Sequence, residues 1–255
     1  MSAGHTHGLY RPGDTVVHRL PAHCKLVAVI VFVLLVVATP RTAFWAFAAY
    51  ALLLAGVSAL AQVPPATLLR RMTVEVPFVL FALLLPFVAE GPRVDVLGVA
   101  VSESGLLAAW NILAKGTLGV LAAVLLAATT PARQLLLGLE RLHMPALMVQ
   151  IMSFMFRYAN VVGAEMARMK VARESRGFQG RDLRHARVVA QSAGALFIRS
   201  YERGERVHLA MLSRGYTGRM PTVVELRADR RQWAVSAALP TAALAILGTA
   251  WLARL

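Results

Sequence analysis

Two short segments of this chain carry the residues best suited to binding chemistry, an arginine between a serine and a glycine. Residues 172–181 read ARESRGFQGR and residues 210–219 read AMLSRGYTGR, so both fit the pattern AxxSRG(F/Y)xGR. Arginine presents a planar fork of N–H donors that can bind a carboxylate through two parallel hydrogen bonds. The arginines of the two copies, Arg176 and Arg214, therefore predict two matched contacts with acidic surfaces of a partner.

Each copy of the motif is expected to end a long helix. Both copies close a polar stretch with helical apolar spacing, and the glycine follows where helices often end on a left-handed residue, which glycine adopts without steric cost. The arginine then falls in the last turn, where a cation offsets the partial negative charge of the helix dipole. The three central residues of the motif are Ser175, Arg176 and Gly177 in the first copy and Ser213, Arg214 and Gly215 in the second.

The chain lacks the common sequence patterns of catalysis and nucleotide binding. It has no Gly-Lys dipeptide and no two glycines separated by one residue, which excludes a P-loop and a dinucleotide-binding fingerprint. The patterns HExxH, CxxC and GxSxG are also absent. Cys24 is the single cysteine, so no disulfide framework is expected. We therefore expect no catalytic residue, no metal site, no cofactor and a role that is not enzymatic.

The composition indicates a membrane protein. Of the 255 residues, 58% are hydrophobic and only 16% are charged, which is too apolar for an ordinary soluble domain. The net charge of +14 could indicate nucleic-acid binding, but the chain has no zinc-finger spacing and no aromatic-basic RNA signature. An excess of arginine and lysine on the cytoplasmic side of membrane spans explains the charge better. We therefore expect the chain to be embedded in the lipid bilayer and not to bind nucleic acid.

Five segments are apolar enough to cross a bilayer, namely residues 25–39, 43–61, 74–89, 105–129 and 232–252. The loop after the second carries Arg70 and Arg71, whereas the loop after the third has three acidic residues against Arg93 alone. The positive-inside rule then puts the N-terminus and residues 131–231 in the cytoplasm. Those 101 residues hold 18 Arg or Lys against 8 Asp or Glu, as the rule requires. The expected location is the bacterial inner membrane.

The predicted fold is an all-α integral membrane protein with about five transmembrane helices and a cytoplasmic domain. Residues 1–130 would form an N-terminal membrane domain of four spans, residues 131–231 the cytoplasmic domain, and residues 232–255 the last transmembrane helix. The cytoplasmic domain would hold a short amphipathic helix over 133–142 and two long helices, one ending at Arg176 and the other running from about residue 183 to Arg214.

The first long helix carries a row of methionines at helical spacing. The row comprises Met148, Met152, Met155, Met166 and Met169, with Ala159 and Val162 between them. Methionine is unbranched and flexible, so such a row suits a surface that repacks against a moving neighbour, although ordinary helix packing gives the same spacing. In the second helix, Ser200 and Gly204 stand four residues apart, where small side chains would let another helix cross closely.

Two charged residues fall inside the predicted spans. Lys115 lies in the middle of the fourth span with Asn111 one turn away, and Glu75 lies near the inner end of the third. A charge inside the membrane marks a functional site by default. Lys115 is about 21 Å from the inner end of its helix, so a direct pair with Glu75 is not expected. Structural anchoring of Lys115 and a role in a transport path are the two interpretations.

The paired motifs, the run SFMFRY at residues 153–158 and the run RSYERGERVHLAMLSRGY at 199–216 resemble one known family. They are similar to the transmembrane T component of energy-coupling factor (ECF) transporters, and most like its CbiQ branch for cobalt. Residues 18–26, which enter the first span, are similar to the same family. The family usually has Ala-Arg-Gly where this chain has Ser-Arg-Gly in both copies.

This resemblance implies a scaffold rather than an enzyme. It implies coupling helices that hold two cytoplasmic ABC-type ATPases, and a separate substrate-binding membrane subunit of the CbiM/CbiN kind. By the same resemblance, one motif docks each ATPase, with support from Arg157, Tyr158, Glu165, Glu202 and Arg203 on the long helices. The methionine row would face the substrate-binding subunit or a crossing coupling helix.

The resemblance implies that the complex takes up cobalt, and nickel or vitamin uptake is the near alternative. An intramembrane lipid-modifying enzyme is an alternative from another class, but acidic and histidine residues do not cluster at helical spacing in any predicted span. A secondary transporter that uses Lys115 is the third alternative. Inverted repeats with broken helices would be expected of it, whereas the repeat found here runs parallel and lies outside the spans.

Overall fold

The structure, a computed structural model, describes residues 10–90, 92–96, 99–178, 186–218 and 228–253. The chain divides into two compact units. The membrane unit contains the described residues up to 142 and those from 228 onward, and the helical hairpin contains the described residues from 143 to 218.

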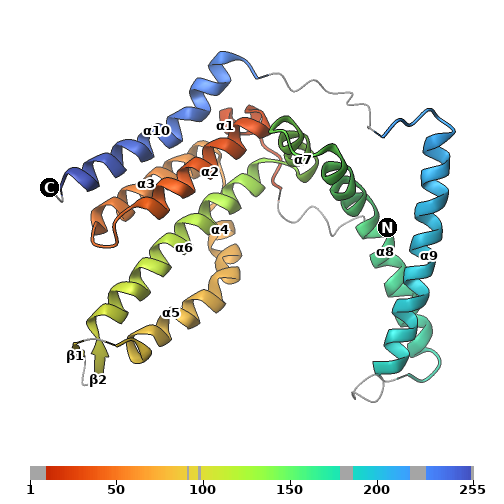
Figure 1. Ribbon diagram of the computed structural model, residues 1–255, viewed down its shortest axis with the longest axis horizontal. Coiled ribbons are helices and arrows are strands. Elements are labelled where there is room, and N and C mark those ends of the chain that lie inside the picture. The colour runs from red at the N-terminus through yellow and green to blue at the C-terminus, as the bar shows by residue number, and fades with distance from the viewer. Residues whose placement is uncertain (1–9, 91, 97–98, 179–185, 219–227, 254–255) are drawn as a thin grey trace. The chain divides into compact units, whose positions relative to one another are not determined.

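The membrane unit is built almost entirely of helices (Figure 1). In chain order these are α1 (Val16–Arg19), α2 (Ala22–Ala38), α3 (Phe44–Leu60), α4 (Pro65–Arg71), the 3₁₀ helix η1 (Met72–Glu75), α5 (Val76–Val88), α6 (Glu103–Thr129), α7 (Ala132–Arg141) and α10 (Arg230–Leu252). Strands β1 (Arg93–Val96) and β2 (Val99–Ser102) pair antiparallel between α5 and α6, with Val96 opposite Val99. The prediction of an all-α membrane protein is confirmed, although it did not include this small hairpin.

Among the described residues, four helical segments are long and apolar enough to cross a membrane. They are Pro65–Val88, Glu103–Thr129, Ala146–Glu174 and Arg230–Leu252. The first, second and fourth correspond to predicted spans, whereas the third was predicted as a cytoplasmic helix. The other two predicted spans are α2 and α3, apolar helices of 17 residues each, which is the lower limit for crossing a bilayer core. The chain is thus a multi-pass helical membrane protein.

The third predicted span begins nine residues earlier than expected. Residues 74–89 were predicted, but α4, η1 and α5 form a helical segment over Pro65–Val88. Arg70 and Arg71 therefore lie on α4 rather than in a loop. Pro77 lies in the first turn of α5, where its missing N–H costs no helical hydrogen bond, so the proline does not prevent the helix.

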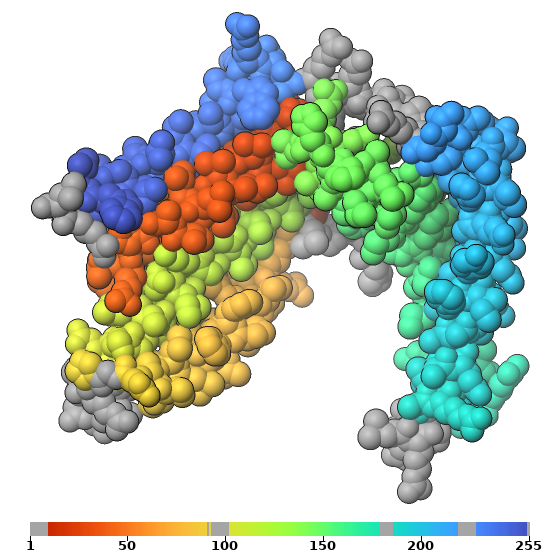
Figure 2. Space-filling model, viewed as in Figure 1, coloured from red at the N-terminus to blue at the C-terminus, as the bar shows by residue number. Residues whose placement is uncertain are grey.

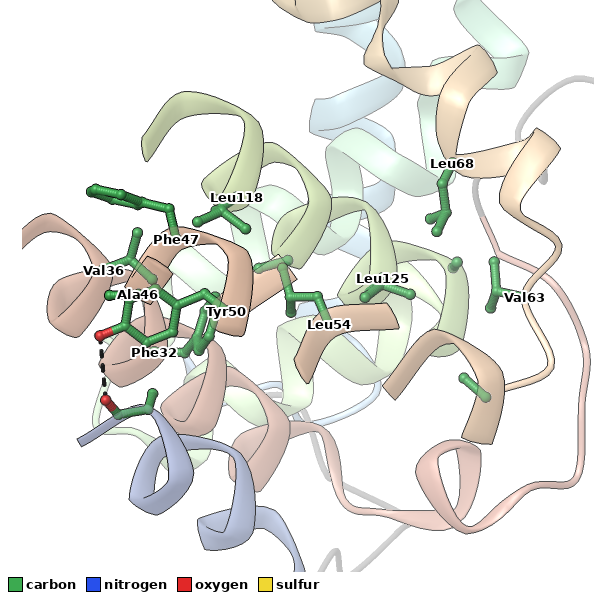
Figure 3. Close-up of a cluster of buried hydrophobic side chains, with 14 of the residues drawn as sticks. Phe32, Val36, Ala46, Phe47, Tyr50, Leu54, Val63, Leu68, Leu118 and Leu125 are labelled. Carbon is green, nitrogen blue, oxygen red and sulfur yellow. Dashed lines mark hydrogen bonds between the residues drawn. The ribbon is translucent and has the colours of Figure 1, made fainter. Parts of the chain in front are cut away.

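The core of the membrane unit lies between α2, α3, α6 and α10 (Figure 3). Phe32 and Tyr50 are fully buried and meet edge to face with their ring centroids 5.8 Å apart. The Tyr50 hydroxyl lies 3.0 Å from the Thr39 hydroxyl and 3.3 Å from the Ala243 carbonyl oxygen. One side chain thus links α3 to the end of α2 and to α10.

The short amphipathic helix α7 packs against α2 within the membrane unit. Gly138 of α7 comes so close that an added Cβ would lie 2.9 Å from the backbone nitrogen of His23. The structure therefore groups α7 with the membrane unit, and the cytoplasmic domain over residues 131–231 stays a prediction.

The helical hairpin consists of α8 (Ala146–Glu174) and α9 (Ala186–Leu212). The two helices pack against each other and run in opposite directions (Figure 1). In Figure 2 they form one continuous body, coloured from green to blue. Two long helices are present as predicted, and each ends two residues before its predicted last residue. The predicted start of the second helix at about residue 183 lies outside the described residues.

Candidate functional site

Both copies of the repeated motif end their helices in the same way. Gly177 and Gly215 have φ angles of +80° and +81°, in the left-handed region. The amide of the residue after each glycine donates to the carbonyl five residues before it, at 3.1 Å in the first copy and 3.0 Å in the second. The glycine amide itself donates to the carbonyl three residues before it, at 3.0 Å in both copies. This is the Schellman motif, so the predicted glycine helix ends are confirmed.

The serines of the motif bond within their own helices. The Ser175 hydroxyl donates to the Ala172 carbonyl at 3.1 Å, and the Ser213 hydroxyl donates to the Ala210 carbonyl at 3.0 Å. The first alanine and the serine of AxxSRG thus form one local hydrogen bond in each copy. The last carbonyls of a helix have no backbone N–H donor within the helix, and the serine hydroxyl supplies a donor to one of them.

The arginines of the two copies are exposed to solvent. Arg176 and Arg214 follow the last residues of α8 and α9, beside carbonyls at the negative ends of the helix dipoles. Within the described part of the chain, neither side chain has an ion pair or a hydrogen bond. Their guanidinium groups are therefore available to a carboxylate of another molecule.

The two motif copies lie at opposite ends of the hairpin. Glu165 of α8 bonds Arg199 and Arg203 of α9 near the middle of both helices. Gln150, in the second turn of α8, bonds Tyr216 just beyond the end of α9. The second copy thus lies beside residue 150 of α8 and the first at its far end, 25 residues on, which is about 38 Å at 1.5 Å per residue.

The middle of the hairpin contains most of the predicted supporting residues. Glu165 is 16% exposed and accepts from Arg199 at 3.1 Å and from Arg203 at 3.4 Å. A cavity of about 220 Å³ adjoins this cluster, and it is lined by Phe154, Tyr158, Val161, Val162, Glu165, Leu196, Arg199, Ser200, Arg203 and Gly204. Ser200 and Gly204 line this cavity, but a Cβ added at Gly204 would meet no atom within 4 Å, so the predicted close helix crossing at these small residues is not found. Two further predicted residues, Arg157 and Glu202, point to solvent.

Comparison with known proteins identifies the family. The sequence pattern of the CbiQ family, described as cobalt transport protein, matches residues 13–223. The chain belongs to the CbiQ family of cobalt transport proteins. It is 28% identical over 225 residues to the energy-coupling factor transporter transmembrane protein EcfT of Bacillus subtilis, covering 83% of this chain and 84% of that protein.

Two other relatives match shorter parts of the CbiQ-family chain. The cobalt transport protein CbiQ of Rhodobacter capsulatus is 34% identical over 95 residues, which is 37% of this chain and 39% of the relative. The uncharacterized protein MJ1089 of Methanocaldococcus jannaschii is 32% identical over 144 residues, which is 56% of this chain and 53% of the relative. The chain thus spans about half or less of these two relatives and most of EcfT.

The methionine row of this CbiQ-family protein lies mostly outside the contact between α8 and α9. Met148, Met155 and Met166 are 47%, 65% and 59% exposed, and Met152 and Met169 are half-buried. Phe154, Tyr158, Val161, Val162 and Glu165 face α9 instead, as the cavity lining shows. The row therefore gives the hairpin an exposed apolar surface, and its predicted partner stays a prediction.

The two charges inside the predicted spans bind separate partners. The Lys115 Nζ donates to the carbonyl of Val37 at 2.7 Å, in the last turn of α2. Glu75 is 4% exposed and accepts from the Thr117 hydroxyl at 2.6 Å. They do not pair with each other, as expected, but the expected reason was wrong, because Glu75 reaches Thr117, only two positions from Lys115. The Lys115 contact favours structural anchoring over a transport path.

The described residues contain no group of three or more His, Cys, Asp or Glu side chains that could hold a metal ion. Cys24 is buried in α2. Among the interactions that escaped the sequence analysis are those of Lys25 with Thr129, Glu165 with Arg199, and Gln150 with Tyr216. Each joins residues at least 34 positions apart, so no local pattern could reveal it.

Proposed function

We propose that this chain is the transmembrane coupling component of an ECF-type ABC importer, and that its two SRG helix ends dock two ATPase subunits. The observation that supports this best is the repetition of one exposed cationic helix end at opposite ends of a single hairpin. Two like ATPase subunits present the same acidic groove twice, which suits a partner with two equal contacts. The extended match to EcfT supports the same role.

The chain itself performs no chemistry in this proposal. ATP binding and hydrolysis take place on the partner subunits, and their closure moves the two helix ends. Each guanidinium fork holds a carboxylate of its ATPase, and the rigid helices carry the movement along their length. At 29 residues, α8 is about 43 Å long, which is enough to carry displacement far from the docking point.

The proposed cargo is the cobalt ion. The description of the matching family and the name of the Rhodobacter capsulatus relative support this choice. A separate membrane subunit of the CbiM/CbiN kind would bind the ion. The exposed methionines of α8, Met148, Met155 and Met166, offer that subunit an adaptable apolar surface.

The proposed orientation puts the N-terminus and the helical hairpin in the cytoplasm, where the ATPases are. The charge of residues 131–231, with 18 Arg or Lys against 8 Asp or Glu, supports this orientation. In this arrangement α8 is a cytoplasmic helix despite its apolar composition, and its exposed apolar side chains contact the other membrane subunit.

Copurification and uptake test this proposal. A tagged chain, expressed with its genomic neighbours, should bring down an ABC-type ATPase and a membrane subunit. Vesicles that contain the complex should take up cobalt when ATP is supplied to the ATPase side, and should prefer cobalt to nickel. A chain that purifies alone and moves an ion without ATP would contradict the proposal, and a preference for nickel would contradict the cargo alone.

A further inference from the structure

The two copies of the motif differ in the residue that follows their glycine. The first copy has Phe178, whose ring lies 5.8 Å from the guanidinium carbon of Arg173 on the same helix. The second has Tyr216, whose hydroxyl donates to the Oε1 atom of Gln150 on the other helix at 2.6 Å. A phenylalanine cannot make this hydrogen bond. The two helix ends are therefore alike in backbone, and the residue after the glycine carries a hydroxyl that bonds across to α8 in the second copy and no hydroxyl in the first.

The position of Tyr216 is fixed by the helix end itself. Its amide donates to the Met211 carbonyl at 3.0 Å in the Schellman motif, and its ring lies edge-on to that of His208, with centroids 6.5 Å apart. The side chain is half-buried. Arg214 lies only two residues before Tyr216, so the bond to Gln150 ties the docking arginine to the second turn of α8.

We propose that the Tyr216–Gln150 hydrogen bond is a latch that makes the two ATPase contacts mechanically unequal. Movement at Arg214 passes directly to the start of α8 through this latch, whereas movement at Arg176 reaches α8 at its far end. Tyr216 and Gln150 are positioning residues that act through Arg214. This inference rests on the proposed docking of the two helix ends.

A double-mutant cycle on ATPase binding tests the latch. Tyr216→Phe gives the second copy the aromatic residue of the first and removes only the hydroxyl. The affinity for the purified ATPase is measured with the full-length protein in lipid nanodiscs. Tyr216→Phe is tested alone, in combination with Arg176→Ala, and in combination with Arg214→Ala. With Arg176→Ala, docking depends on the second helix end, and Tyr216→Phe should weaken binding about fivefold, the loss expected for one hydrogen bond. With Arg214→Ala, it should have no further effect.

Three control variants separate the latch from general stability. Gln150→Ala removes the acceptor from the other helix and should reproduce the effect of Tyr216→Phe. Gln150→Glu retains an acceptor and should preserve binding. Phe178→Tyr adds a hydroxyl to the first copy, far from Gln150, and should leave ATPase binding unchanged. Membrane insertion should be the same for all of them, and thermal unfolding should change by no more than the loss of one hydrogen bond allows.

The outcomes distinguish the latch from the docking proposal on which it rests. Equal losses in the Arg176→Ala and Arg214→Ala backgrounds, or no loss in either, would overturn the latch while leaving docking intact. If neither arginine variant weakens ATPase binding, the docking proposal fails and the latch fails with it. Loss confined to the Arg176→Ala background supports both.

Discussion

Lys25 of α2 donates from its Nζ to the carbonyl of Thr129, the last residue of α6, at 3.0 Å. Its other contacts are the Thr130 hydroxyl at 3.0 Å and the His18 carbonyl at 3.3 Å. Lys115 of α6 donates in return to Val37, in the last turn of α2. Each helix of this pair thus supplies a cation to the C-terminal carbonyls of the other, where the helix dipole favours positive charge.

Lys25→Met should destabilise the membrane unit by about 1 to 3 kcal/mol, because the buried Thr129 and Thr130 acceptors lose their donor while the apolar volume is kept. Thermal unfolding in detergent measures the effect. Lys170→Met is the matched control, since Lys170 is exposed and forms a surface ion pair with Glu174 at 3.8 Å. Equal unfolding temperatures for the two variants would show that the Lys25 contacts contribute nothing.

Arg176→Ala combined with Arg214→Ala should abolish cobalt uptake while the protein still inserts in the membrane. Loss of one partner of a buried charge pair costs about 2 to 5 kcal/mol, so two losses exceed what docking can tolerate. Each single variant should retain part of the uptake. The control is Arg168→Ala, an exposed arginine of α8 with a 3.7 Å contact to Glu165. Normal uptake by the double variant at normal expression would exclude the docking role.

Gly177→Ala should weaken ATPase binding although both arginines are kept. A left-handed backbone costs an L-residue about 1 to 2 kcal/mol. The alanine would therefore disfavour the left-handed conformation that ends α8, and Arg176 would be displaced. Gly215→Ala should do the same at the end of α9. Gly163→Ala is the control, because a Cβ added at that helical position meets no atom within 4 Å. Binding that is equally strong in all three variants would contradict this account.

The sequence predicted best what local chemistry determines. The glycine in each SRG motif indicated a left-handed helix end, and the apolar segments indicated the spans. Each of these signals is carried by residues that are close together in the sequence. The β1–β2 hairpin was missed although Val94, Val96, Val99 and Val101 alternate along it, which is a strand signal.

Contacts between distant residues could not be predicted in this way. Lys25 and Thr129 are 104 positions apart, and Gln150 and Tyr216 are 66 positions apart. Their pairing depends on how α2 packs on α6 and how α9 returns beside α8. A single sequence carries the residue types for these bonds, but only the fold shows which donor reaches which acceptor.

Replacing Met152, Met155 and Met166 together with valine should leave the transporter complex assembled but lower the cobalt transported per ATP hydrolysed. Met155 and Met166 are exposed on the hairpin and Met152 is half-buried, so the row can contact the substrate-binding subunit. Methionine can repack as that contact changes during the cycle, whereas β-branched valine is stiff at χ1 and favours one arrangement.

The matched control replaces the same three methionines with leucine, which is closer in volume and more flexible than valine. Both triple variants are reconstituted in vesicles, and cobalt uptake and ATP hydrolysis are measured on the same preparation. The leucine variant should keep a higher transport ratio than the valine variant. If the valine variant couples as well as the unmodified chain, the methionine row is ordinary packing surface, because a stiff side chain then serves the moving contact equally well.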